Sequence, residues 1–108
     1  MTSMTTDNMV LLVRLVKSMR EMGCESYMGG QDAEIVGRWI RKVEKTMIKI
    51  SILEGLRVNY ATQLLSDRAM TWWEIVQLRH ATEILTWSDF KTEFENQFYS
   101  RYHHKVKE

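Results

Sequence analysis

The 108-residue sequence contains no proline. Proline interrupts helices because it lacks a backbone N–H and its ring clashes with the preceding turn. Glycine, the other residue that weakens a helix interior, occurs only five times. A chain with so few interruptions is expected to be all helical with short connections. Its length suits one domain with one hydrophobic core, and we treat residues 1–108 as a single domain.

Start and stop signals divide the chain into five expected helices. The first runs from about Asp7 to Met22, with Thr6 or Asp7 as its N-cap and Gly23 as its stop. The second begins at Asp32, a good N-cap, and continues to about Lys49 with apolar residues at helical spacing. Residues 23–31 are expected to form a loop between them.

A third helix is expected from Ser51, because Ser51 and Glu54 have the spacing of a capping box. Its apolar residues form two stripes, which favours a central position in a bundle. The stripes consist of Leu53, Leu56, Tyr60 and Leu64 on one side and Val58, Ala61 and Leu65 on the other.

Aromatic residues dominate the last two expected helices. The fourth starts after Ser66, and Ala69, Trp72, Trp73 and Val76 follow the pattern of one buried face. The fifth starts at Thr86 with Asp89 in the capping-box position. Its aromatic line consists of Trp87, Phe90, Phe94 and Phe98, extended by Tyr102. We interpret the adjacent tryptophans as core, since a base-stacking platform would have basic residues interleaved. The expected fold is a compact all-α bundle of about five helices.

Three stretches resemble blocks of the Gag domain of Ty3/gypsy-type long-terminal-repeat retrotransposons. YMGGQDAEIVGRWI resembles its opening block, LLSDRAMTWW its second block and TWSDFKTEFENQFYSRY its third, in the same order over about residues 27–108. The matching positions, which we expect to form the core, are Tyr27, Gly29, Asp32, Trp39, Leu65, Ala69, Trp72, Trp73, Trp87, Phe90, Phe94 and Phe98. Ala33, Asp67 and Ser100 depart from the family, which has proline, glycine and proline there.

The resemblance implies a fold like the N-terminal half of a retroviral capsid protein. It implies a structural protein that self-assembles into virus-like particles around the element's RNA, with no catalytic residue, cofactor or metal. A full Gag would add a C-terminal capsid half and often a zinc knuckle. We therefore expect a fragment, with RNA bound through a downstream region, or a short derivative kept by a host. In the latter case it would be an interaction module for a host protein or peptide.

The residues agree with an absence of catalysis. His80 falls near the end of the fourth helix, where a core or capping histidine is expected, and the adjacent His103 and His104 diverge on a helix. The lone Cys24 has no evident base and favours a reducing, intracellular compartment, taken as the cytoplasm. A net charge of +1 gives no bulk attraction to nucleic acid or membrane.

Two regions remain as candidates for binding. Residues 1–26, the N-terminal helix and loop, are apolar almost all round, which favours self-association. The residues expected to mediate it are Leu11, Leu12, Leu15, Val16, Met19 and Met22. At the other end, Arg101, Lys105 and Lys107 are candidates for RNA contact, although they also suit a solvated helix terminus. A helix-turn-helix nucleic-acid binder using the basic second helix is a further alternative.

Overall fold

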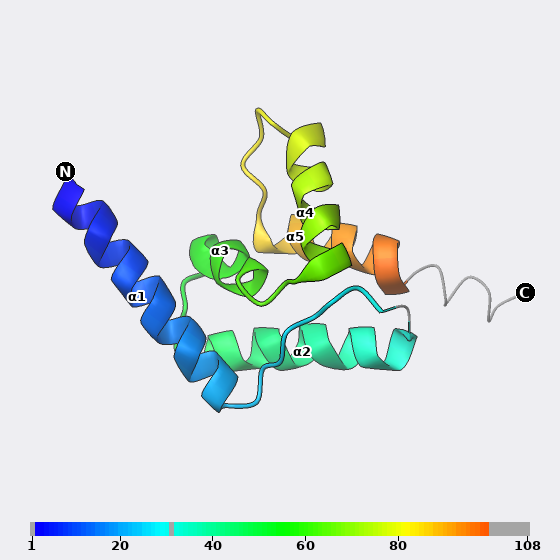
Figure 1. Ribbon diagram of the computed structural model, residues 1–108, viewed down its shortest axis with the longest axis horizontal. Coiled ribbons are helices and arrows are strands. Elements are labelled where there is room, and N and C mark those ends of the chain that lie inside the picture. The colour runs from blue at the N-terminus through cyan, green and yellow to red at the C-terminus, as the bar shows by residue number, and fades with distance from the viewer. Residues whose placement is uncertain (1, 31, 100–108) are drawn as a thin grey trace, which may run out of the picture.

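The computed structural model describes residues 2–30 and 32–99, and these form an all-α domain (Figure 1). In chain order the elements are α1 (Thr2–Glu21), α2 (Ala33–Lys49), the 3₁₀ turn η1 (Glu54–Leu56), α3 (Arg57–Thr62), α4 (Asp67–Arg79), α5 (Trp87–Phe94) and the π-helical turn η2 (Glu95–Tyr99). The only strand-like pairing in the described part is an isolated parallel bridge between Tyr27 and Leu65. The predicted all-α class with about five helices is confirmed.

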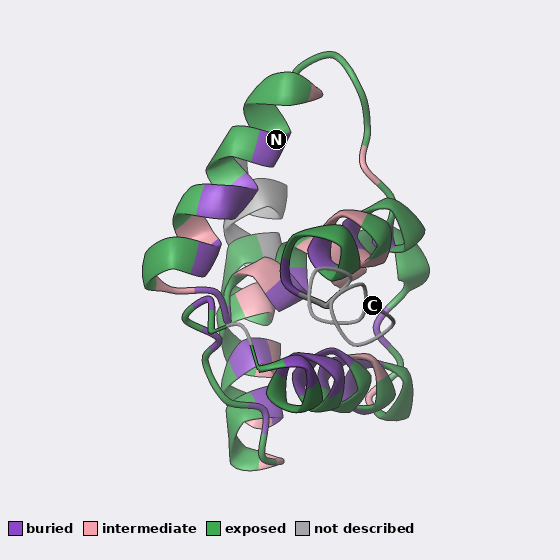
Figure 2. Ribbon diagram, turned by 90° about the vertical axis from the view of Figure 1, so that its right-hand side faces the viewer, coloured by how far each residue is buried: buried purple, intermediate pink, exposed green. Residues whose placement is uncertain are grey.

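α2 and the rod formed by α5 and η2 pack side by side, and α4 stands across them (Figures 1 and 2). α1 packs on α2 through its C-terminal half, which contributes Val16 and Met19 to the core. Its N-terminal half extends away from the rest of the molecule (Figure 1). The two halves of this helix therefore meet different surroundings.

α1 and α2 both end in a Schellman motif. At the end of α1, Gly23 has φ +102, and the N–H groups of Gly23 and Cys24 donate to the carbonyls of Arg20 and Met19. At the end of α2, Ser51 takes the same place with φ +62, and Ile52 donates to the carbonyl of Met47. The predicted stop at Gly23 is confirmed. The predicted span of α2 is also confirmed, with the Asp32 carboxylate accepting from the N–H groups of Glu34 and Ile35.

The prediction of a long central helix from Ser51 is wrong. Ser51 closes α2 instead of capping a new helix, and no side-chain cap bond is present at the start of η1. The segment contains a 3₁₀ turn and a six-residue helix, and Leu53 and Leu56 are exposed. The second half of each predicted stripe does reach the core, through Tyr60, Ala61, Leu64 and Leu65.

The other helix starts are largely as predicted, except the first. α1 begins at Thr2, so Thr6 and Asp7 lie inside it and neither starts it. α4 follows Ser66, whose side chain makes no cap bond, and its first residue, Asp67, has φ +50. This left-handed conformation suits the glycine that the Gag family carries there, and aspartate is among the residues that tolerate it. At Thr86 the predicted capping box is present in full.

Candidate functional site

Six aromatic rings meet where the loop after α1, α2, α4 and the α5–η2 rod converge. We call them the aromatic centre: Tyr27, Trp39, Trp72, Phe90, Phe94 and Phe98. The ring centroid of Phe94 lies between 5.2 and 5.8 Å from those of the other five. Such separations suit edge-to-face and offset aromatic contacts. The rings of the aromatic centre therefore pack directly on one another at the point where these elements meet.

The loop that carries Tyr27 is fixed by its backbone to the connection between α3 and α4. The N–H of Tyr27 donates to the carbonyl of Leu64 at 2.8 Å, and the N–H of Ser66 donates to the carbonyl of Tyr27 at 3.0 Å. Gly29 has φ +108, and a Cβ there would lie 2.8 Å from the Cβ of Arg68. Only glycine allows this approach without displacement. Burial raises the pKa of the Tyr27 phenol, which donates to the carbonyl of Gly30.

The family-matching residues serve the interior and the helix ends. Trp39, Trp72, Trp73 and Trp87 are 2–8% exposed, and Leu65, Ala69 and the phenylalanines are equally buried. Asp32 is exposed and acts as the N-cap of α2. None of the four tryptophans is therefore available as an open platform for bases or sugars.

The candidate self-association residues divide between the core and the surface. Val16 and Met19 are buried in the chain's own core, so they expose little surface to a second subunit. Leu12, Leu15 and Met22 are partly buried. The open apolar surface lies further toward the N-terminus: Met9, Val10, Leu11 and Val13 are 62%, 47%, 46% and 69% exposed.

Three of these residues form the outer face of α1, which we define as Met9, Val10 and Val13 with Arg14 and Lys17 at its edge. They line a shallow groove of about 510 Å³. The apolar residues around the helix indicated in the sequence that some apolar surface would stay exposed. They did not indicate which residues of α1 face the core. That depends on the crossing of α1 over α2, which is a long-range contact.

A second hollow, of about 530 Å³, lies between the loop after α1 and α2. Its lining includes Glu25, Tyr27, Ile35, Arg38, Trp39 and Lys42. The indole N–H of Trp39 donates to the carbonyl of Glu25 at 2.7 Å, which holds the loop against the helix. The hollow thus combines apolar walls with cations at its rim. Sequence reasoning did not predict it.

Glu44 joins α2 to α5 through its carboxylate. One oxygen accepts from the Trp87 indole N–H at 2.6 Å and from the Lys91 ammonium at 2.8 Å. Partial burial favours a higher pKa for Glu44, but these hydrogen bonds, with the charges of Lys91 and Arg57, outweigh it and hold the pKa below its usual value. The carboxylate is therefore ionised at neutral pH and acts as a structural link.

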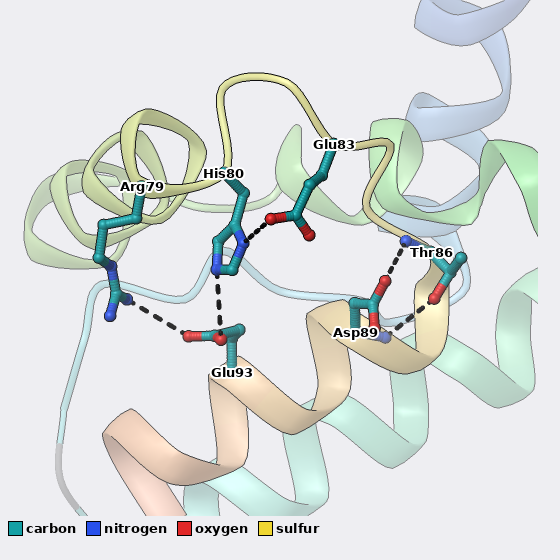
Figure 3. Close-up of polar contacts among 6 residues, drawn as sticks. All are labelled: Arg79, His80, Glu83, Thr86, Asp89 and Glu93. Carbon is teal, nitrogen blue, oxygen red and sulfur yellow. Dashed lines mark hydrogen bonds and ion pairs between the residues drawn. The ribbon is translucent and has the colours of Figure 1, made fainter.

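His80 lies at the C-cap of α4, the capping position that the sequence suggested. Figure 3 shows its ring between two carboxylates: Nδ1 is 3.1 Å from Glu83 and Nε2 is 3.7 Å from Glu93, which also pairs with Arg79 at 3.3 Å. The Thr86–Asp89 capping box lies beside it, and hydrogen bonds from the backbone and side chain of Thr86 lower the pKa of Asp89. Together these contacts anchor the loop between α4 and α5.

No arrangement for metal or covalent chemistry emerges among the described residues. They contain no group of three histidine, cysteine or acidic side chains placed to hold a metal ion. Cys24 is buried, with its sulfur 4.0 Å from the carbonyl of Lys42.

Across the described residues, no helix combines the length and apolar character needed to cross a bilayer. Tyr102, His103, His104 and the RNA candidates Arg101, Lys105 and Lys107 lie outside the described residues, as does Ser100.

Comparison with known proteins identifies a family. A family model described as the N-terminal capsid-like domain of the retrotransposon-derived protein PEG10 matches residues 21–99, which include α2 to α5 and the whole aromatic centre. No curated protein and no solved structure matches.

Proposed function

Because the chain belongs to the family of the PEG10 N-terminal capsid-like domain, we propose that it is a self-associating structural module without catalytic activity. Copies of the domain meet through the outer face of α1. The family has a retrotransposon-derived, Gag-like origin, which agrees with the resemblance of the three sequence blocks.

The observation that carries this proposal is the exposure of apolar side chains on a helix that projects from the body. Met9 and Val13 are more than 60% exposed because they lie in the projecting N-terminal half of α1, whereas the C-terminal half supplies Val16 and Met19 to the core (Figure 1). Contiguous apolar surface on a projecting element is typical of protein–protein contacts. An isologous contact between two copies would cover the same residues on both.

The contact is expected to be weak. A stable interface buries about 800 Å² per partner, and one face of half a helix offers only a fraction of that area. A module of this kind assembles cooperatively when many copies and additional contacts are present. Virus-like particles, with RNA bound through further segments such as Arg101, Lys105 and Lys107, remain our proposal for the full assembly, as does the cytoplasm as its location.

Sedimentation velocity over a wide concentration range tests the proposal. The wild type should show reversible, concentration-dependent association. Val10→Lys/Val13→Lys should weaken it by at least about tenfold, because two charges would be placed in the contact. Ile75→Lys/Leu78→Lys is the matched control, since it adds the same charges at the same spacing on exposed apolar positions of α4. Equal weakening by both variants, or a monomer at every concentration, would contradict the proposal.

The hollow beside α2 favours a second candidate function, the binding of a host protein segment. Ile35, Tyr27 and Trp39 provide apolar walls, and Arg38 and Lys42 lie at the rim. This chemistry suits an extended peptide with apolar and acidic residues. A peptide-array screen would reveal such ligands, and Ile35→Glu should abolish their binding without changing self-association. Peptide binding that Ile35→Glu leaves intact would place the ligand elsewhere.

A further inference from the structure

The solvent side of α2 carries five basic residues: Arg38, Arg41, Lys42, Lys45 and Lys49. At about 100° per residue they fall within an arc of about 100°, so they form one stripe along the helix. All five are exposed, and Figure 2 shows exposed residues along the outer side of α2 while its buried residues face the body. We call these residues the basic face of α2.

The two acidic residues of α2 do not neutralise this face. Glu34 pairs with Arg38 at 2.8 Å, which accounts for one cation at the N-terminal end. Glu44 points away from the stripe toward Trp87 and Lys91. In the part of the chain that the structure describes, no ion pair joins Arg41, Lys42, Lys45 or Lys49 to a carboxylate. The face therefore keeps four uncompensated cations.

The overall charge of the chain hides this asymmetry. Five cations and two carboxylates give α2 a formal charge of +3. Since the whole chain carries +1, the remaining residues carry −2. A local field of one sign attracts a polyanion even when the net charge is small.

We propose that the basic face of α2 binds the phosphodiester backbone of nucleic acid. Cations recurring every three or four residues stand about 5 Å apart along the helix axis, which presents a linear row of charges to a linear polyanion. The described surface of α2 exposes no aromatic ring for base stacking, so binding is independent of base sequence. The proposal adds a nucleic-acid surface to the domain itself and does not depend on self-association.

A membrane surface fits these observations less well. The apolar side of α2 is buried in the core, so the helix has no continuous apolar face to insert between lipids. Ile35 and Ile48 are exposed but lie at opposite ends and opposite edges of the stripe. An acidic protein also fits less well, because its carboxylates are not spaced in a regular row that would match the row of cations on α2.

Fluorescence anisotropy with a labelled, unstructured oligouridine RNA tests the proposal on the full chain. Arg41→Gln/Lys45→Gln/Lys49→Gln removes three cations from exposed positions, so circular dichroism and thermal unfolding should be unchanged. Losing three phosphate contacts should reduce the slope of log affinity against log salt by about 2. Affinity should fall on the order of 100-fold at 0.1 M salt.

The matched control is Arg101→Gln/Lys105→Gln/Lys107→Gln, which removes the same charge from the other candidate RNA segment. It should lower affinity by less than the α2 variant does. The proposal fails if the control weakens binding as much as the α2 variant, if the wild type does not bind RNA at low salt, or if polyglutamate or phosphatidylserine vesicles bind as tightly as RNA. Because sedimentation reports self-association separately, failure here leaves the proposed assembly function standing, and the reverse also holds.

Discussion

The aromatic centre and the outer face of α1 are both rich in apolar side chains, yet only one of them is closed. Around Phe94, five rings approach within 5.8 Å, and all six residues are buried. On the outer face of α1, Met9, Val10 and Val13 contact solvent on a helix that projects from the body (Figure 1).

The difference shows what apolar composition alone leaves open. In α5 the aromatic residues recur on one side and polar residues fill the other, so a single buried face accounts for all of them. In α1 apolar residues surround the helix, and the core uses its C-terminal half, through Val16 and Met19. The apolar surface of the projecting N-terminal half remains available to a partner.

The largest expected effect comes from the aromatic centre. Phe94→Ala should lower the free energy of unfolding by about 4 kcal/mol, because it removes a buried ring that contacts five others. Urea denaturation measures the loss. Ile84→Ala, at a position 94% exposed, should change stability by about 0.5 kcal/mol or less. A loss near 1 kcal/mol for Phe94→Ala would mean that the centre is loosely packed.

Gly29 tests how the loop holds Tyr27 in that centre. Gly29→Ala should cost about 2 kcal/mol, since the residue has a positive φ and its Cβ would collide with Arg68. The control is Gly30→Ala, where a Cβ meets nothing within 4 Å, and it should be within about 0.5 kcal/mol of the wild type. Thermal unfolding compares the two variants, and similar losses in both would contradict the close approach at Gly29.

Glu44 should make the free energy of unfolding depend on pH, an effect not expected from the outer face of α1. Because its folded-state pKa is lowered, its contribution to stability is present above the ordinary value of 4.5 and is lost as pH falls through the folded-state pKa. Glu44→Gln should cost about 1 to 2 kcal/mol at pH 7 and less at pH 3. Denaturation at both pH values measures this, with the exposed Glu74→Gln as a control expected to show little change. A pH-independent loss would show that the charge of Glu44 plays no part.

The smallest effect on stability is expected on the outer face of α1. At concentrations where the chain is monomeric, Val10→Lys/Val13→Lys should change the free energy of unfolding by about 0.5 kcal/mol or less, because both positions are exposed and lysine favours helices. Guanidinium denaturation of the dilute protein provides the measurement. A loss of several kcal/mol would place these residues in the fold of the monomer.

Local signals in the sequence predicted much of the fold. The Asp32 cap, the stop at Gly23 and the Thr86–Asp89 capping box depend on neighbouring residues, and all three are present. Ser51 shows the limit of such reasoning. Its spacing to Glu54 also fits a capping box, but the residue instead closes α2 in a left-handed conformation that is usually taken by glycine.

The candidate sites depended on contacts between distant segments. The pairing of Tyr27 with Leu64 and Ser66, the crossing of α1 over α2 and the turning of Glu44 toward α5 join residues far apart in the sequence. These contacts decide which part of α1 is open and which cations of α2 are unpaired. The residue types suggested the outer face of α1 and the basic face of α2. Only the arrangement of the helices shows which of their residues are exposed and which belong to the core.

The most direct test of the assembly surface is cross-linking between copies. In a Cys24→Ala background, Val13→Cys places a single thiol on the outer face of α1, and Ile84→Cys places one on the α4–α5 loop. With a short bis-maleimide linker, Val13→Cys should form covalent dimers at concentrations where the wild type associates, and Ile84→Cys should remain largely monomeric. Equal yields from both positions, or dimers only through Ile84→Cys, would contradict an interface formed by α1.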